Sequence, residues 1–141
     1  KILNVENKND THETQVEASH NAYLKNFGCI HNRSISIDKT NNKVVGRDRL
    51  IQKSINSKIK YDIRFHLYPG LSAVQTIGGN TLLIQINKNK ALLFSTNEKK
   101  LNIEKSIFFG GQKVLNNYCI VISGVMESNE KTINWEIIKK I

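Results

Sequence analysis

The sequence lacks any apolar run long enough to cross a bilayer, and its first residues lack the hydrophobic core of a signal peptide. We therefore expect no membrane partner. An initial methionine is also absent, and Lys1–Asn7 has the pattern of the interior of a strand. These features indicate a piece cut from a longer protein, so the missing signal leaves the location of the parent protein open.

Arginine is scarce: the chain has 4 arginines and 17 lysines. Its formal net charge of +9 therefore comes mainly from lysine. The lysines are scattered among asparagines, a composition typical of proteins encoded by AT-rich genomes. Lysines of this kind usually lie on turns and edge strands, where they keep the surface soluble. A nucleic-acid-binding domain would instead show an arginine-rich patch interleaved with aromatic residues. We therefore expect no nucleic-acid partner. A basic face can still serve an acidic polysaccharide, because sulfates and uronates obey the same electrostatics.

Cysteine is limited to Cys29 and Cys119, each within an apolar strand pattern. The favoured interpretation is two buried thiols that pack as small hydrophobic groups. A disulfide would require the two strands to face each other, which the sequence leaves undecided. The redox compartment stays open for the same reason.

Helical patterns are almost absent, whereas short alternating segments recur along the chain. At 141 residues, the chain has the length of one domain with a substantial core. The predicted fold is all-β, an antiparallel two-sheet β-sandwich of the supersandwich type with eight to ten strands. The expected strands are Thr14–Ala18, Cys29–Asp38, Val44–Ile51, Tyr61–Tyr68, Leu71–Ile77, Thr81–Ile86, Ala91–Ser95, Leu101–Phe109, Asn117–Val125 and Thr132–Lys139.

Polar segments connect these strands. Ser19–Phe27 is irregular with two aromatic residues, which predicts a loop, and Gln52–Lys60 is a lysine-rich connection. Gly78-Gly79 and Gly110-Gly111 are expected in turns, because they lack the strand-to-helix context of a phosphate-binding loop.

The stretch Tyr61–Gly70 is the segment around which the chemistry of the chain is expected to gather. Apolar residues alternate with charged and polar ones, and Pro69-Gly70 then ends the strand, because proline has no N–H for a ladder. Arg64 and His66 are therefore expected on one face, about 7 Å apart at two strand rises.

A hairpin is predicted where Cys29–Asp38 and Val44–Ile51 flank the turn cluster Lys39–Lys43. If the turn lies at the middle of that cluster, Arg33 comes opposite or diagonal to Asp48. The two side chains would then form an ion pair across the strands.

Three residues form the one histidine and aspartate set that we can assemble: His31, Asp48 and His66. Three protein ligands suit a zinc ion, and neutral imidazole is its commonest ligand. We therefore name these residues as the candidate site of one divalent metal, with zinc the favoured ion. The alternative is structural, with half-buried histidines that hydrogen-bond to their neighbours.

Four residues are candidates for substrate binding. His20 and Tyr23 fall in the predicted loop, where binding groups concentrate, and a tyrosine beside a histidine can donate a proton or stack on a sugar ring. The alternative for this pair is an aromatic plug on the sandwich edge. Arg33 and Arg64 can hold a carboxylate or sulfate by a bidentate fork, although pairing with Asp48 is the favoured alternative for Arg33.

Several short motifs occur in a defined order along the chain. They are Ala18-Ser-His-Asn-Ala-Tyr23, Phe27-Gly28, His31-Asn-Arg33, Gly46-Arg-Asp48 and Arg64-Phe-His-Leu-Tyr-Pro69. Their order and spacing resemble the C-terminal β-domain of heparinase II/III-like proteins, in particular the alphaproteobacterial branch. The later segments Ser106–Gly110 and Ile120–Gly124 resemble the strands that follow, so the similarity extends over essentially the whole chain.

The resemblance implies a parent protein with an N-terminal helical toroid followed by this β-sandwich. Proteins of this family are polysaccharide lyases or their relatives, and they cleave uronic-acid-containing chains by β-elimination. An acidic polysaccharide and the toroid are therefore the implied partners, and a divalent metal held by His and Asp is often structural in the β-domain. A periplasmic location is implied, with a cytoplasmic one left open.

The main catalytic residues are implied to lie outside this chain, because the family places most of them in the toroid. The family also has a His-Asn/Ser-Thr motif at the start of the β-domain, and no such motif precedes Val16. The isolated chain is therefore expected to support the substrate cleft without being active itself. The alternative function is a non-catalytic carbohydrate-binding or structural module.

The sequence departs from the motifs of that branch at three positions. Asn21 and Ala22 replace the Asp and Gly of its Ser-His-Asp-Gly-Tyr segment, which puts in doubt any role that needs a carboxylate there. Tyr68 replaces the second His of its Arg-Phe-His-Leu-His-Pro motif and removes one candidate ligand.

Overall fold

The computed structural model describes residues 1–53 and 58–140. This part of the chain forms eleven strands and one helical turn, which confirms the all-β prediction. The number of strands is one more than the upper limit of the eight to ten predicted. The elements are β1 (Ile2–Asn9), β2 (Glu13–His20), α1 (Leu24–Phe27), β3 (Cys29–Asp38), β4 (Lys43–Gln52), β5 (Ile59–His66), β6 (Ser72–Gln75), β7 (Thr81–Asn87), β8 (Lys90–Thr96), β9 (Lys100–Gly110), β10 (Lys113–Met126) and β11 (Glu130–Lys140).

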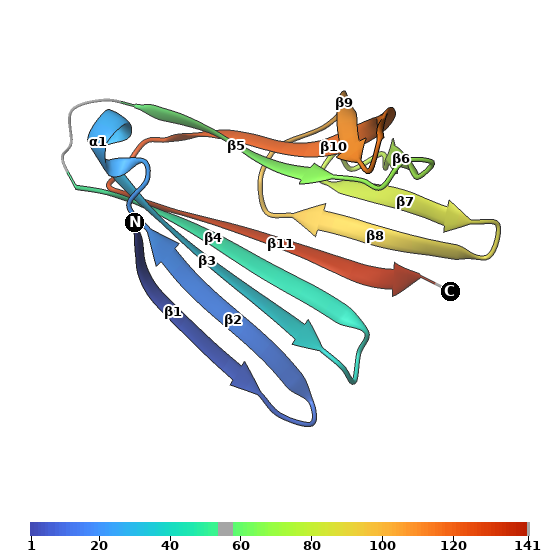
Figure 1. Cartoon of the computed structure of the whole chain (residues 1–141), viewed down its shortest axis with the longest axis horizontal. Helices are drawn as coiled ribbons and strands as arrows, with labels where there is room; N and C mark the ends of the chain where they lie inside the picture. Colours follow the sequence, from blue (N-terminus) through green and yellow to red (C-terminus); the bar gives the residue numbers. More distant parts are fainter. Residues whose placement is uncertain (54–57, 141) are drawn as a thin grey trace.

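The strands form two antiparallel sheets of unequal size. The large sheet has the order β1-β2-β3-β4-β11-β8-β7-β6, and the small sheet has the order β5-β10-β9. Figure 1 shows β5 and β10 running above the large sheet, with α1 at the end of the sandwich where β5 begins. β11, which comes late in the sequence, lies between β4 and β8 in the middle of the large sheet.

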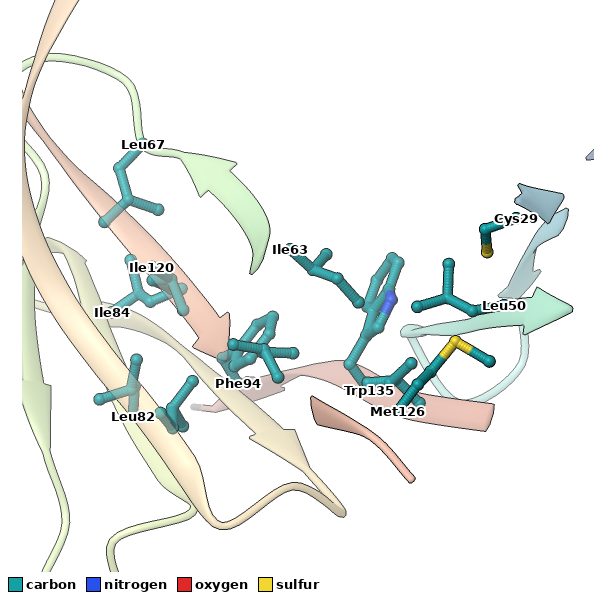
Figure 2. Packing of buried hydrophobic residues seen from close by; sticks show 13 residues of the cluster. Cys29, Leu50, Ile63, Leu67, Leu82, Ile84, Phe94, Ile120, Met126 and Trp135 are labelled. Carbon is teal, nitrogen blue, oxygen red and sulfur yellow. The ribbon is translucent and has the colours of Figure 1, made fainter. Parts of the chain in front are cut away.

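The core lies between the two sheets, where the apolar positions of the alternating strands meet. Trp135 on β11 is at its centre, with its ring 4.8 Å from that of Phe65 on β5 and 6.4 Å from that of Phe94 on β8. Figure 2 shows Trp135 between Ile63 and Met126. Each fully buried side chain of this size contributes about 1.5–3 kcal/mol to stability relative to an exposed one.

The predicted hairpin of β3 and β4 is confirmed, with Arg33 directly opposite Asp48. Because successive side chains of a strand point to opposite faces, His31 and Arg33 lie on the same face of β3. His20 is paired with His31 in the register of β2 and β3. Pairing across three neighbouring strands therefore brings His20, His31, Arg33 and Asp48 together on the inner face of the large sheet.

The predicted loop Ser19–Phe27 is wrong in part. β2 continues to His20, and Leu24–Phe27 forms a helical turn that ends at Gly28 in the left-handed conformation, with φ of 63°. Glycine adopts this conformation without the steric penalty that a Cβ atom introduces. His20 is therefore fixed by a strand, and Tyr23 begins the helical turn.

The predicted connection Gln52–Lys60 lies in part outside the described residues. Gln52 is the last residue of β4, and Ile59 and Lys60 begin β5. At its other end β5 stops at His66, two residues before the predicted end at Tyr68. β10 is longer than predicted, because it begins at Lys113.

The two cysteines are free and buried, which confirms the interpretation as packed thiols. Burial raises the pKa of both Cys29 and Cys119. Among the described residues, no helix has the length and apolar character needed to cross a membrane.

Candidate functional site

A pocket of about 520 Å³ opens between the two sheets at the end of the sandwich that carries α1. Its volume lies in the usual range for ligand pockets. One wall comes from β2, α1, β3 and β4, and the other comes from six consecutive residues of β5, Ile59–Arg64. All four predicted binding residues line this pocket: His20, Tyr23, Arg33 and Arg64. The first three come from the large-sheet side, whereas the side chain of Arg64 shares the outer face of β5 with Asp62 and lies at the edge of the pocket.

Asp48 accepts hydrogen bonds from three side chains around the pocket, and its own side chain is completely buried. Oδ1 accepts hydrogen bonds from His31 Nε2 at 2.7 Å and from Arg33 Nε at 2.6 Å, and Oδ2 accepts one from Trp135 Nε1 at 2.8 Å. Burial acts to raise the pKa of this carboxyl group, but the three hydrogen bonds outweigh burial and hold the pKa below its ordinary 3.8. Asp48 is therefore ionised at neutral pH.

A chain of hydrogen bonds leads from Asp48 to the helical turn. His31 Nδ1 lies 3.0 Å from His20 Nε2, and His20 Nδ1 accepts the backbone N–H of Ala22 at 3.2 Å. Because the backbone N–H can only donate, a neutral His20 carries its proton on Nε2 and donates it to His31. His31 then carries its own proton on Nε2 and donates it to Asp48.

Both histidines are neutral in this arrangement, and all four ring nitrogens are occupied. Burial is the main cause that lowers the pKa of His20 below its ordinary value, which agrees with the neutral form. A general base needs a free nitrogen within reach of the proton that it removes. Neither His20 nor His31 has one in this arrangement, because hydrogen bonds to Ala22, to each other and to Asp48 engage all four nitrogens.

Tyr23 stands at the rim of the pocket with 46% of its surface exposed. Its ring centre lies 5.2 Å from that of His20, 6.4 Å from that of His31 and 6.3 Å from that of Phe27. Among the described residues its hydroxyl group has no hydrogen-bond partner. The ring and the hydroxyl group are therefore both available to a ligand.

The two arginines of the pocket differ in how their charge is balanced. Arg64 forms ion pairs with Asp62 at 3.0 Å and with Glu104 at 2.8 Å, and these hydrogen bonds raise its pKa. Arg33 uses only Nε, toward Asp48, and its terminal nitrogens have no partner among the described residues. Arg33 thus keeps the open bidentate fork that the sequence analysis assigned to both arginines.

Sequence reasoning missed several residues of this site. Phe27, Lys60, Tyr61 and Asp62 also line the pocket, and Trp135 holds Asp48 from a position 87 residues away. The alternation of β5 placed Tyr61 on the inner face, but only the packing of the two sheets shows which pocket that face lines. No local signal in the sequence links Trp135 to Asp48.

The three metal candidates are only partly brought together. His31 and Asp48 are in contact, whereas His66 lies near the end of β5, outside the pocket, with Nδ1 3.1 Å from Ser106 Oγ. Within residues 1–53 and 58–140, no group of three or more His, Cys, Asp or Glu side chains is arranged to hold a metal ion. The zinc site stays a prediction that measurement has to decide.

If His31, Asp48 and His66 hold zinc, the purified chain is expected to carry about one metal ion, because structural zinc binds tightly. Replacing His66 by alanine would then remove the metal and lower the melting temperature. Elemental analysis and thermal unfolding of both proteins check this. If the purified chain is free of metal and His66→Ala melts at the same temperature, the three residues have structural roles and hold no zinc.

The chain has clear relatives in fold. The family model described as "Heparinase II/III-like, C-terminal" matches residues 1–136. The heparan sulfate lyase HepC from Pedobacter heparinus superimposes with a TM-score of 0.82 at 12% identity, over 99% of this chain and 22% of that one. A HepC mutant gives a TM-score of 0.79 at 11% identity with the same coverage.

The heparinase III-BT4657 gene product, with methylated lysines, gives a TM-score of 0.68 at 12% identity, over 93% of this chain and 20% of that one. This chain thus spans about a fifth of the length of these solved proteins. No curated protein matches it in sequence. Because the family model covers nearly the whole chain, the chain belongs to the heparinase II/III-like family, of which it is a C-terminal β-domain.

Proposed function

We propose that this domain forms one wall of the substrate cleft of a polysaccharide lyase and binds an acidic polysaccharide at the pocket beside α1. The parent protein carries out β-elimination on a uronic-acid-containing chain, with an N-terminal toroid as the other wall. The short motifs around His20 and Arg64 favour the alphaproteobacterial branch of the family. The solved relative HepC is by its name a heparan sulfate lyase, which agrees with this class of reaction.

The observation that carries the proposal is the meeting of His20, Tyr23, Arg33 and Arg64 at one pocket. These residues come from a strand, a helical turn and two further strands, over more than 40 positions of sequence. The aromatic ring of Tyr23 supplies a surface for a sugar ring, and Arg33 supplies donors for an anionic group. Together they match the two features of an acidic sugar.

The pocket supports binding more than proton transfer. β-Elimination needs a base at the proton beside the carboxylate and an acid at the leaving oxygen. The nitrogens of His20 and His31 are all engaged in hydrogen bonds, so among the described residues of the pocket Tyr23 is the free proton-carrying group on the inner wall. The missing base is proposed to come from the toroid, which leaves the isolated chain inactive.

The purified chain is expected to bind acidic tetrasaccharides, with changes in the amide resonances of α1 and β5. Replacing Tyr23 by alanine is expected to weaken binding about tenfold, which corresponds to the loss of one good contact. Titrations followed by nuclear magnetic resonance check both expectations. Absorbance of an unsaturated uronide product is expected to stay at the background level in the same samples.

The matched control is Phe109→Ala, which removes another exposed aromatic ring, on β9 and outside the pocket. This variant is expected to bind as the unchanged chain does. Equal weakening by both substitutions, or resonance changes confined to other strands, would move the ligand away from this pocket. Steady formation of unsaturated product would place the catalytic set within the chain.

A further inference from the structure

The ribbon formed by the end of β9 and the start of β10 extends beyond the rest of the small sheet. β10 pairs with β9 from Lys113 to Ser123, whereas it pairs with β5 only from Cys119 to Met126. Residues 106–117, which we call the β9–β10 finger, therefore form a ribbon without a third strand in the described part of the chain. Figure 1 shows β9 at the side of the molecule away from α1, so the finger and the pocket lie at opposite ends.

The finger exposes apolar side chains on both of its faces. On the face that continues the core-facing side of the small sheet, Ile107, Phe109 and Val114 are 52%, 80% and 63% exposed. On the other face Leu115 is 42% exposed. A cluster of exposed apolar side chains marks an interaction surface, and a flat partner covers only one face of a ribbon. The finger therefore fits a medium that surrounds it.

Carboxylates are scarce at this end of the molecule. Residues 63–97 and 105–126 contain no aspartate or glutamate. The two carboxylates between these segments, Glu98 and Glu104, form ion pairs with Lys131 and Arg64. The finger and the neighbouring strands β6, β7 and β8 thus carry no unbalanced negative charge.

Six exposed lysines lie at the same end: Lys88, Lys90, Lys105, Lys113, Lys139 and Lys140. The last two are on β11 opposite the start of β8, and Figure 1 shows the end of β11 and the turn between β7 and β8 on the side away from α1. Within residues 1–53 and 58–140, the ion pairs of lysine involve Lys8, Lys43 and Lys131. The six charges are therefore unbalanced, and they surround an apolar finger.

The combination of the two features indicates the chemistry of the partner. A soluble polyanion, such as an acidic polysaccharide, would neutralise the lysines and leave the apolar side chains of the finger in water. A second copy of the chain would bring the same unbalanced lysines face to face. An anionic lipid bilayer offers both an apolar interior and a negative surface that attracts lysine.

We propose that the β9–β10 finger and the lysines around it dock this domain on the surface of an anionic lipid bilayer. From Gly110 to Ile107 the strand rises about 10 Å, which matches the depth of interfacial insertion. Deeper entry would remove water from the outer backbone groups of the ribbon without giving them partners. The pocket beside α1 then lies at the end of the domain away from the bilayer.

Docking of this kind is independent of spanning segments. The expectation of no membrane partner rested on the lack of a spanning run and of a signal peptide, and it does not extend to a surface that binds lipid from one side.

The test is co-sedimentation with vesicles of phosphatidylcholine, with and without phosphatidylglycerol, at physiological salt. The unchanged chain is compared with Phe109→Ala and Lys113→Glu. The matched controls are Ile77→Ala, which removes an exposed apolar side chain from the turn between β6 and β7, and Lys25→Glu, which reverses an exposed charge on α1. Thermal unfolding verifies that each variant is folded.

The chain is expected to bind the vesicles that contain phosphatidylglycerol about tenfold more tightly than those of phosphatidylcholine alone. Phe109→Ala and Lys113→Glu are each expected to weaken this binding about tenfold, and the two controls by less than about twofold. The variant Phe109→Trp separates insertion from adsorption by charge alone. Because Trp135 is only 5% exposed, a fluorescence shift to shorter wavelength with vesicles, and quenching by brominated lipids, would report on position 109.

Equal binding by Phe109→Ala and Ile77→Ala, or no fluorescence shift with Phe109→Trp, would overturn the inference and leave only adsorption by charge. Heparin binding that depends on Lys113, without vesicle binding, would identify a soluble polyanion instead. A dimer that Phe109→Ala abolishes, again without vesicle binding, would identify a second copy. The parent protein is expected to bind the same vesicles, and binding by the isolated chain alone would show that other domains cover the finger, which would also overturn the inference.

Discussion

Replacing Gly46 by alanine is expected to lower the free energy of unfolding by about 3 kcal/mol, although alanine in a strand is ordinarily the more stable choice. A Cβ atom at position 46 would overlap the six-membered part of the Trp135 ring, at Cε2 and Cζ2. The indole would have to move, and with it the hydrogen bond from Trp135 to Asp48. Urea unfolding followed by the fluorescence of Trp135, which is the only tryptophan, measures the change.

The matched control for this substitution is Gly78→Ala. At position 78 a Cβ atom would come no closer than 3.6 Å to its nearest neighbour, and this glycine does not have a positive φ. Its substitution is expected to change stability by less than about 0.5 kcal/mol. Equal stabilities of the two variants would show that the Trp135 ring has room to shift without loss.

Replacing Asp48 by alanine is expected to destabilise the chain by about 3–5 kcal/mol, because it leaves the half-buried Arg33 guanidinium and two more deeply buried donors, on His31 and Trp135, without their acceptor. Arg33, His31 and Trp135 each lose a hydrogen bond at once. Glu130→Ala also removes a carboxylate from an arginine, but that pair lies at the surface and its loss is expected to matter far less. Urea unfolding of the three proteins provides the comparison.

The same carboxylate makes stability depend on pH in a definite direction. Because hydrogen bonds hold the pKa of Asp48 below 3.8 in the folded chain, the unfolded chain takes up this proton first as the pH falls. The stabilisation is therefore complete well above pH 3.8 and is lost as the pH falls through the folded pKa. Asp48→Ala is expected to flatten this part of the stability curve, and an unchanged slope would show that other carboxylates control it.

The alternation of the sequence was sufficient to predict the strands and one cross-strand pair. The strand period identified β3, β4 and β5, and the turn cluster between β3 and β4 set Arg33 against Asp48, as the structure confirms. The strand period and the turn residues are local properties of the sequence. They predict the structure here because one face of each strand is buried, and burial of one face fixes the register. The family resemblance built on these segments is confirmed at the level of the family.

The parts that sequence reasoning missed depend on contacts between distant strands. The hydrogen bond from His20 to His31 requires the pairing of β2 with β3, which the predicted loop concealed, because β2 was ended two residues too early. The role of Trp135 requires β11 to lie beside β4. Pairing order in a sheet is set by the total packing of both sheets, and no short segment encodes it.

The position of β11 has a consequence for the order in which the chain can fold. β11 fills the gap between β4 and β8, so the large sheet consists of two separate halves until that strand arrives. During synthesis from the N-terminus, hairpins such as β1–β2 and β7–β8 have all their residues early, but β4 and β8 keep open edges until residues 130–140 have left the ribosome. Open edges pair readily with other chains, so the nascent domain is prone to aggregate at this stage. The stage is over once β11 has paired with β4 and β8.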